Sequence, residues 1–530
     1  MFANYLIFKT DFMKKDRPTA VNADLKKRDW FSIFLSIIEK GGNALPHPAT
    51  LFAFFAVSVI VLSWVGYMLG WSAYHPATLE EVSVVNLLSK DNIHRMFLEA
   101  VKNYTGFAPL GIVMVSLLGI GIAESSGLIS AAVRLLIQKA PSKMLTFVLV
   151  LAGVLSNTAS DLGYVLIIPM AGVIFHAVGR HPVAGMAAAF AGVSGGFSAN
   201  FFIGTIDPLL AGLSTESAMI IDENYKVLPT ANYYFMAVSA LFVSFMVTWI
   251  THRIVEPRLG TYDGHVPKES LAPLESKERK GLFWSLILFV GWVVLIFATT
   301  VPQGAFFRGV DGSLLHSPLL EGFITLLFLM AGSLGLMYGV ITGKFKNDND
   351  LVKGMTESFK TLASFLVLVF FAAQFVAFFK WSHLGLVFAI KGAGFLQDIN
   401  IGLVPLIILF VVLSAFLNLF MGSASAKWAI LGPVFIPMFM LLGYSPELSQ
   451  AVFRVGDSVT NIISPMMSFF ALIIVYFEKY DNKSGIGTLI ATMMPYSLIL
   501  FVFWTALLVG WALLNLPLGP GSPIHYMGQP

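Results

Sequence analysis

Six ionisable side chains lie within or beside the long apolar stretches of this 530-residue chain: Glu124, Asp161, Asp207, Lys427, Arg454 and Asp457. An ionisable group at the centre of a bilayer costs roughly 2.5–3.5 kcal/mol on insertion scales, so each is a functional candidate by default. An arginine fork suits carboxylates, and a buried aspartate suits a cation or a proton. Together they predict a site for small charged solutes inside a membrane.

The strongest pair is Arg454 and Asp457, which are three residues apart and share one helix face. Two interpretations stay open. Either the two side chains neutralise each other, or Arg454 faces an anionic substrate while Asp457 binds a cation or a proton. Lys427 either snorkels to the membrane surface or contacts substrate, and Trp428 either stacks on an aromatic substrate or belongs to an interfacial belt.

The composition places these residues in a polytopic membrane protein. Hydrophobic residues make up 57% of the chain and charged residues only 12%, against about 25% charged in ordinary soluble proteins. Apolar runs such as residues 50–70 and 282–299 are long enough to cross a bilayer. A net charge of +3 gives no reason to expect nucleic acid, and the lack of cysteine excludes disulfides and thiolate chemistry.

Enzyme motifs are weak. Residues 192–196 match the G-x-S-x-G pattern, but a nucleophile elbow requires a preceding strand, and the surrounding sequence is alanine-rich and helical. No H-E-x-x-H, P-loop or dinucleotide motif occurs. We therefore expect neither an enzyme nor a cofactor.

Apolar segments and the distribution of Lys and Arg predict an all-α protein of nine transmembrane helices plus two re-entrant hairpins. The first 28 residues carry seven basic side chains, which predicts a cytoplasmic N-terminus, and the span count then places the C-terminus in the periplasm. Residues 30–40 form either a helix on the membrane surface or the start of the fold. The loop around residues 75–102 is predicted to be periplasmic. Each hairpin could instead be two ordinary spans.

The predicted organisation has five parts. Residues 1–49 form the cytoplasmic tail and interfacial helix, and residues 253–280 form a cytoplasmic loop. Residues 50–252 form a first repeat, with a hairpin at about 143–180 and a broken helix at about 183–214. Residues 281–516 form a second repeat, with a hairpin at about 401–443 and a broken helix at about 447–479. Residues 517–530 form a periplasmic tail.

The repeat rests on matching motifs in the two halves. Ser156-Asn157-Thr158 precedes Ser423-Ala424-Ser425 by 267 residues, and the segment 195–200 precedes the segment 456–461 by 261. Because the first hairpin opens to the cytoplasm and the second to the periplasm, the repeat is predicted to be inverted. The second break is expected at residues 458–461.

Broken helices in a membrane free backbone groups that only protein or water can shield, and their carbonyls can coordinate Na⁺. The alternative is that small polar residues merely allow close helix packing. The oxygen-bearing side chains predicted to bind a cation are Ser156, Asn157, Thr158, Asn200, Ser423, Asp457 and Asn461.

Several long motifs resemble the AbgT family of p-aminobenzoyl-glutamate transporters. They are Leu155-Ser156-Asn157-Thr158 with its continuation to residue 164, and residues 191–200, 204–212, 422–426, 454–461 and 103–111. The resemblance covers most of the chain. It implies a bacterial inner-membrane protein, a homodimer of nine-span protomers with two hairpins each, and elevator-type alternating access.

The resemblance also implies a function and a site. Members take up p-aminobenzoyl-glutamate, and some export sulfonamides. The implied activity is ion-coupled secondary transport of p-aminobenzoyl-glutamate or related aromatic amides, driven by H⁺ or Na⁺. The alternatives are a sodium-coupled carrier of another anionic metabolite and a passive channel. The implied substrate site comprises Asp207, Asn418, Ser425, Trp428, Pro446, Arg454, Asp457 and Pro465.

Overall fold

The computed structural model describes residues 46, 48–74, 80–138, 141, 144–158, 163–262, 274–309, 317–481 and 484–528. The basic tail, the helix expected at residues 30–40 and Asp161 lie outside the described residues. Within them the fold is helical apart from one short hairpin, in which β1 (Ser72–Tyr74) pairs antiparallel with β2 (Glu81–Ser83). The predicted all-α class is confirmed.

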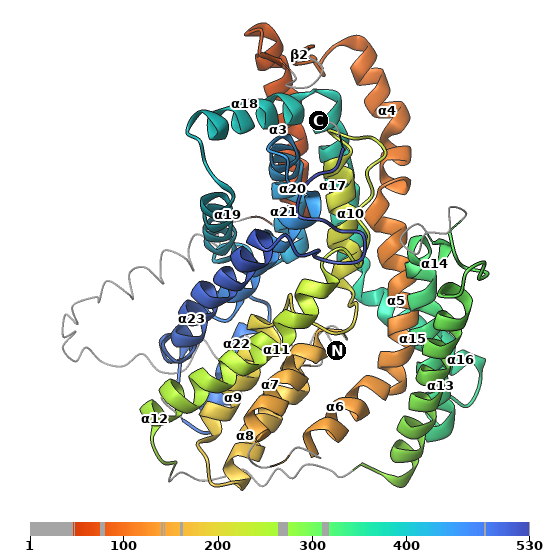
Figure 1. The fold of residues 1–530 in the computed structure, drawn as a ribbon, viewed down its shortest axis with the longest axis vertical. Helices are drawn as coiled ribbons and strands as arrows, with labels where there is room; N and C mark the ends of the chain where they lie inside the picture. Colours follow the sequence, from red (N-terminus) through yellow and green to blue (C-terminus); the bar gives the residue numbers. More distant parts are fainter. Residues whose placement is uncertain are drawn as a thin grey trace, which may run out of the picture.

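One peripheral bundle surrounds α5 (Ala108–Ser126) and stands at the right of Figure 1. Its other helices are α6 (Leu128–Gln138), α13 (Ser276–Thr300), α14 (Pro318–Glu321), α15 (Phe323–Thr342) and α16 (Asp348–Thr361). The α5 and α15 backbones approach so closely that a Cβ on Gly335 would lie 2.5 Å from the Ala123 Cα. Glu124 lies near the C-terminal end of α5.

A second peripheral group joins α3 (Pro48–Met68), α4 (Lys90–Thr105), α17 (Ala363–Trp381) and α18 (Leu384–Asp398). The prediction of a loop around residues 75–102 is wrong for its second part, because residues from Lys90 onward form α4. The Ser89 side chain caps this helix by accepting from the Asn92 backbone N–H. Ile93, Phe97 and Val101 recur at helical spacing, which the mixed charge had obscured.

The centre of the molecule consists of two helical hairpins and two broken helices. Hairpin 1 comprises α7 (Leu145–Ser156), the π-helical turn η2 (Gly163–Ile167) and α8 (Ile168–Ala177). Hairpin 2 comprises α19 (Leu403–Asn418) and α20 (Ala424–Leu441). Broken helix 1 is α9 (Pro182–Phe190) with η3 (Ala191–Gly195), then α10 (Ile206–Ala218). Broken helix 2 is α21 (Pro446–Asn461), then α22 (Phe470–Glu478).

Each broken helix reaches into the other half of the molecule. Hairpin 1 lies in the lower part of Figure 1 and hairpin 2 in the upper part. The second piece of broken helix 1, α10, packs against α20 of hairpin 2, and α22 contacts α9. The four elements therefore meet in the interior.

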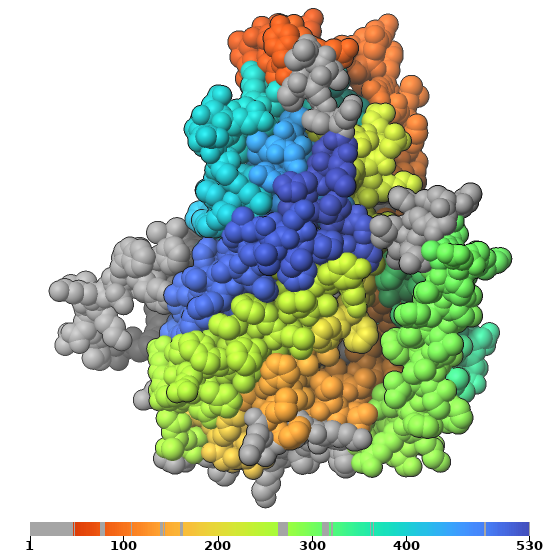
Figure 2. Space-filling model, viewed as in Figure 1, coloured from red at the N-terminus to blue at the C-terminus, as the bar shows by residue number. Residues whose placement is uncertain are grey.

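Two long helices and a returning segment cover one face of this centre. Helices α11 (Tyr233–Ile250) and α23 (Ile486–Leu513) pack together, and Figure 2 shows α23 as a diagonal blue band beside the yellow-green α11. The chain continues from α11 through η4 (Thr251–Val255) into α12 (Glu256–Leu259).

After α23, residues 514–528, which we call the C-terminal strap, fold back over the ends of α11 and α21. The Leu518 carbonyl accepts from Tyr234 N at 2.9 Å and Phe235 N at 3.2 Å, and Ser445 N donates to the Ile524 carbonyl at 2.9 Å.

By length and composition, the described chain contains seven helices able to cross a membrane, or eight when the bent pair Asp348–Lys360 and Phe365–Trp381 counts as one span. One of the seven is α20, the second helix of hairpin 2. The pieces of both broken helices are too short to qualify alone. The count of nine spans and two hairpins therefore stays a prediction, as do the boundaries of the predicted parts.

Candidate functional site

The centre of the site is α21, whose 16 residues are all buried. Ser445 caps its N-terminus by accepting from Leu448 N, and Pro446 opens its first turn. Polar residues recur along it at intervals of three and four, which places them on one face. They are Glu447, Gln450, Arg454, Asp457 and Asn461. A buried polar stripe needs partners on neighbouring elements, and the structure supplies one for each charged group of α21.

Arg454 pairs with Asp207 and not with Asp457. The distance from Arg454 Nη2 to Asp207 Oδ1 is 2.5 Å, and both side chains are nearly inaccessible. Asp207 sits in the first turn of α10, where the helix dipole favours an anion, and its Oδ2 accepts from Gly204 N at 2.7 Å. The alternative in which Arg454 and Asp457 neutralise each other is wrong, because the acidic partner of Arg454 comes from the other half of the chain.

The Arg454 guanidinium keeps spare hydrogen-bonding capacity. Its Nε is buried, and no described residue accepts a hydrogen bond from it. A buried, unpaired donor on a charged group is costly, so it needs an explanation. Arginine forks bind carboxylates through two parallel N–H groups. Arg454 therefore offers a donor that a second carboxylate could occupy.

Asp457 pairs instead with Lys427, at 2.5 Å between Nζ and Oδ1. The Lys427 ammonium also donates to Asn418 Oδ1. Because Lys427 is only 1% exposed, the interpretation that it snorkels to the membrane surface is wrong. A mainly apolar cavity of about 310 Å³ between α3 and hairpin 2 includes Lys427 in its lining.

Trp428, the next residue, is fully buried and stacks on Phe453 of α21, with ring centroids 4.6 Å apart. Its indole N–H donates to Ser214 Oγ at 2.9 Å, and the Ser214 hydroxyl donates to Gln450 Oε1 at 2.7 Å. Gln450 Nε2 donates in turn to Asn232 Oδ1 at 2.9 Å. This chain of hydrogen bonds fixes the orientation of the indole.

Ser214, Gln450 and Asn232 were not among the residues predicted from the sequence. Of the three, only Gln450 could have been predicted from the sequence, because it lies four residues before Arg454 on the same helix face. Ser214 and Asn232 are ordinary polar residues in their local sequence, and their role depends on the contacts of α10 and of the residue before α11 with α21.

Two asparagines link the hairpin tips to the helix breaks. Asn157 donates to the carbonyls of Val193 at 2.9 Å and Gly196 at 3.5 Å, at the end of η3. Asn418 donates to the Asp457 carbonyl at 2.7 Å and also lies within hydrogen-bond distance of Asn461 Oδ1.

These contacts set the register of the repeat. Asn157 and Asn418 are 261 residues apart, as are their carbonyl partners Gly196 and Asp457. The earlier alignment of Ser156-Asn157-Thr158 with Ser423-Ala424-Ser425 is therefore six residues out, because small polar residues on both sides of the tip looked alike.

The other predicted residues lie around the same two junctions. Ser156 is buried, with its hydroxyl bonded to the Gly153 carbonyl, and Asn200 Nδ2 donates to Thr158 Oγ1 at 2.9 Å. In hairpin 2, Ser423 caps α20 and its hydroxyl lies 3.2 Å from that of the partly exposed Ser425.

The second break lies later than predicted. Helix α21 continues through Asn461, and the break occupies residues 462–469, with Pro465 inside it. A proline disfavours helical geometry at the residue before it, which explains the position. Asn461 Nδ2 reaches the Ser194 carbonyl at 3.4 Å, so the two breaks touch.

Two cations and two anions thus share one buried cluster: Arg454, Lys427, Asp207 and Asp457. Their formal charges cancel, which limits the desolvation cost. Within the described residues no group of three or more His, Asp or Glu side chains could hold a metal ion. The arrangement suits exchange of carboxylates and monovalent cations.

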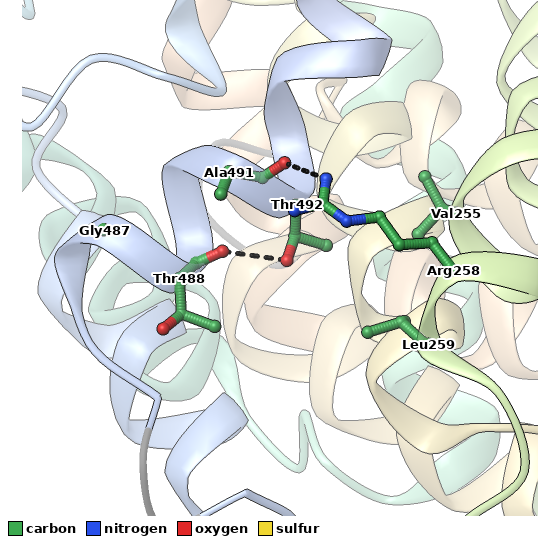
Figure 3. Close-up of a pocket in the computed structure, with 7 residues that line it drawn as sticks. All are labelled: Val255, Arg258, Leu259, Gly487, Thr488, Ala491 and Thr492. Carbon is green, nitrogen blue, oxygen red and sulfur yellow. Dashed lines mark hydrogen bonds between the residues drawn. The ribbon is translucent and has the colours of Figure 1, made fainter. Parts of the chain in front are cut away.

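A cavity of about 400 Å³ lies elsewhere, between η4–α12 and the start of α23 (Figure 3). Arg258 reaches across it to donate to the Ala491 carbonyl at 3.1 Å. None of the predicted site residues is among the seven that line it. Despite its volume, we do not place the substrate there, because the buried charges and the aromatic stack lie at the hairpin junction.

The chain is similar to known transport proteins over most of its length. The model of the family described as "AbgT putative transporter family" matches residues 33–526. The p-aminobenzoyl-glutamate transport protein of Escherichia coli K12 is 36% identical over 485 residues, which are 91% of this chain and 95% of that protein.

Two solved structures are similar over their whole length. The YdaH transporter of Alcanivorax borkumensis shares 45% identity with a TM-score of 0.85, over 90% of this chain and 100% of the other. MtrF of Neisseria gonorrhoeae, described with a class of antimetabolite efflux pumps, shares 47% identity with a TM-score of 0.88, over 92% of this chain and 100% of the other.

A family match across nearly the whole chain, together with several apolar helices, identifies a multi-pass membrane protein. The relatives are transporters, not enzymes, and residues 192–196 lie at the end of η3, not after a strand. The chain belongs to the AbgT family of transporters.

Proposed function

We propose that this protein is an ion-coupled secondary transporter of p-aminobenzoyl-glutamate or related aromatic amides, and that it exports sulfonamide antimetabolites. The named relatives support this substrate class, since one is a p-aminobenzoyl-glutamate transport protein and another is described with antimetabolite efflux pumps. The proposal includes a homodimer in a bacterial inner membrane, with a cytoplasmic N-terminus and a periplasmic C-terminus.

The observation that carries the proposal is the half-satisfied guanidinium of Arg454. Its Nη2 is held by Asp207, while its Nε has no acceptor among the described residues. Asp207 then acts as an internal substitute for a substrate carboxylate. An incoming carboxylate takes up the Arg454 fork and releases Asp207.

The aromatic part of the substrate is assigned to Trp428. Its ring already stacks on Phe453 and its N–H is fixed by Ser214. Because Trp428 is fully buried, substrate contact requires the hairpin tips to separate from the breaks. A relative movement of the central elements against the two peripheral bundles, as in an elevator mechanism, provides that opening.

The coupling ion is H⁺ or Na⁺. Release of Asp207 from Arg454 would leave a carboxylate that takes up a proton. Alternatively, Na⁺ binds the oxygens around Asn157, Thr158 and the end of η3, where helix carbonyls face inward. One charge moved across 100 mV supplies about 2.3 kcal/mol, so one or two coupled ions suffice for a useful gradient.

The test is flux of radiolabelled p-aminobenzoyl-glutamate in proteoliposomes, with Na⁺ and pH gradients imposed separately and in both directions. We expect accumulation against the substrate gradient with at least one imposed ion gradient, and loss of accumulation when that gradient is collapsed. Flux that never exceeds equilibration would indicate a passive channel. Accumulation of other anions but not of this substrate would indicate a carrier of a different anionic metabolite.

A further inference from the structure

The two halves share a backbone arrangement at the junction of hairpin and broken helix, and among the described residues only the second-half junction is contacted by a lysine ammonium. In both, an asparagine near the hairpin tip bonds to a carbonyl close to the end of a helical segment, Gly196 in the first half and Asp457 in the second. In the second half the Lys427 ammonium contacts Asn418 Oδ1 and the Asp457 carboxylate. The residue 261 positions before Lys427 is Leu166.

The position of Lys427 is unfavourable for the helix that carries it. Lys427 lies in the first turn of α20, near the positive end of that helix dipole. Asp457 lies one turn before the end of α21, near the negative end of its dipole. Neither charge stabilises its own helix, so the pair has to be explained by what the two groups do for each other.

The features around Asp457 all attract a cation. They are its carboxylate, the C-terminal carbonyl end of α21 and Asn418 Oδ1, which faces away from the carbonyl-bound amide nitrogen. Without Lys427 this seat would hold a buried carboxylate with no counter-charge, which is strongly destabilising. In the first half, none of the described residues donates to Asn157 Oδ1.

We propose that the Lys427 ammonium is a tethered cation. It fills the second-half seat, which consists of the Asp457 carboxylate, Asn418 Oδ1 and the C-terminal end of α21. The first-half seat around Asn157 is then the exchangeable Na⁺ site. The assignment of Na⁺ to the first-half seat rests on the proposed ion coupling. The assignment of Lys427 to the second-half seat does not depend on it. Removing the lysine should convert the second seat into a Na⁺ site, because Asp457, Asn418 and the helix end remain.

The test measures the thermal unfolding midpoint of the purified full-length protein at pH 8, with NaCl compared against choline chloride at constant ionic strength. We expect Na⁺ to raise the midpoint of the wild-type protein and to have no effect on Asn157→Ala. In Asn157→Ala/Lys427→Met, Na⁺ should again raise the midpoint, by about 2–4 °C. Adding Asp457→Asn to that variant should remove the effect.

Matched variants keep the result interpretable. Lys427→Arg retains the charge, so in the Asn157→Ala background it should show no Na⁺ effect. Lys391→Met, an exposed lysine on α18, should behave in that background like Asn157→Ala alone. If Lys427→Met fails to insert, Lys427→Gln removes the charge while keeping a donor for Asn418.

The outcomes separate the two proposals. A wild-type protein without a Na⁺ effect would refute Na⁺ coupling at Asn157, yet a Na⁺ effect created by Lys427→Met would still support the tethered cation. No Na⁺ effect in the Asn157→Ala/Lys427→Met variant, or an effect that persists after Asp457→Asn, would overturn the tethered cation.

Discussion

The two halves of the centre share a backbone plan and differ in charge. Both place an asparagine from a hairpin tip on the end of a broken helix. At the matching positions, however, the first half carries small or aliphatic residues where the second carries charged or aromatic ones. The pairs, each 261 residues apart, are Val193 and Arg454, Gly196 and Asp457, Leu166 and Lys427, and Ile167 and Trp428.

The two halves therefore share a backbone arrangement and differ in the side chains placed on it. We infer that the first half offers backbone and amide oxygens suited to an ion, and that the second offers a guanidinium and an indole suited to an aromatic carboxylate. The one acid that completes the arginine site, Asp207, comes from the first half, so neither half forms the substrate site alone.

The largest expected effect comes from breaking two ion pairs at once. Arg454→Met/Asp457→Leu leaves Asp207 and Lys427 buried without their oppositely charged partners, and should lower the free energy of unfolding by at least about 3–5 kcal/mol. Arg454→Met/Asp207→Leu removes one complete pair and should fold nearly as well as the wild type, without transporting. Unfolding of the purified variants in detergent measures both. Equal stability of the two doubles would mean that the pairing across the halves is not maintained.

Arg454→Lys should separate substrate binding from folding. Lysine keeps the charge opposite Asp207 but lacks the planar fork, so apparent substrate affinity should fall roughly 10–100-fold, as for loss of a charged hydrogen bond. Transport kinetics in proteoliposomes measure this. Arg258→Lys, on the cavity away from the charged cluster, is the matched control and should change affinity less than about twofold. An unchanged apparent substrate affinity in Arg454→Lys would indicate that Arg454 has a purely structural role.

The two tip asparagines allow a direct comparison of the halves. Asn418→Ala removes contacts to α21 and an acceptor for Lys427, and should cost about 2–3 kcal/mol of stability. Asn157→Ala removes only bonds to carbonyls and should cost about 1 kcal/mol. Both are measured by unfolding in Na⁺-free buffer, so that ion binding does not contribute. A larger loss of unfolding free energy for Asn157→Ala than for Asn418→Ala would contradict the assignment of the charged seat to the second half.

The smallest expected effect is that of Trp428→Phe, which keeps the ring over Phe453 but loses the bond to Ser214. Apparent affinity for the aromatic substrate should fall about fivefold, equivalent to about 1 kcal/mol. Trp504→Phe is a close control, since that buried indole also donates to a serine, Ser239, at 2.9 Å. Both variants should lose similar stability. Equal affinity losses in transport assays would show that Trp428 acts only through packing.

Much of the site was visible in the sequence because charge inside an apolar segment is rare. Arg454, Asp457 and Asp207 stand out on that ground alone, and the polar residues at the breaks follow from backbone that lipid cannot satisfy. The partners were not visible. The spacing of residues on α21 shows that Arg454 and Asp457 share a face. Which acid or base meets that face depends on α10, more than 200 residues away, and on α20 of hairpin 2.

The repeat shows the same limit. Matching by residue type aligned Ser156-Asn157-Thr158 with Ser423-Ala424-Ser425, because a match by residue type does not distinguish one small polar residue from another. The hydrogen bonds of Asn157 and Asn418 set the register instead, because they require a particular carbonyl at a particular distance. Trp428 was visible as an aromatic residue, but the serine, glutamine and asparagine that orient it belong to three different helices.

The C-terminal strap has a consequence for assembly. Its carbonyls satisfy Tyr234, Phe235 and Ser445 N–H groups at the starts of α11 and α21, yet residues 514–528 leave the ribosome after all of these helices. Until then the two helix ends carry unpaired donors, so the centre of the molecule reaches its final hydrogen bonding only when the strap docks. A chain that stops after α23 would leave those helix ends without these acceptors, as would replacement of residues 514–528 by a tag.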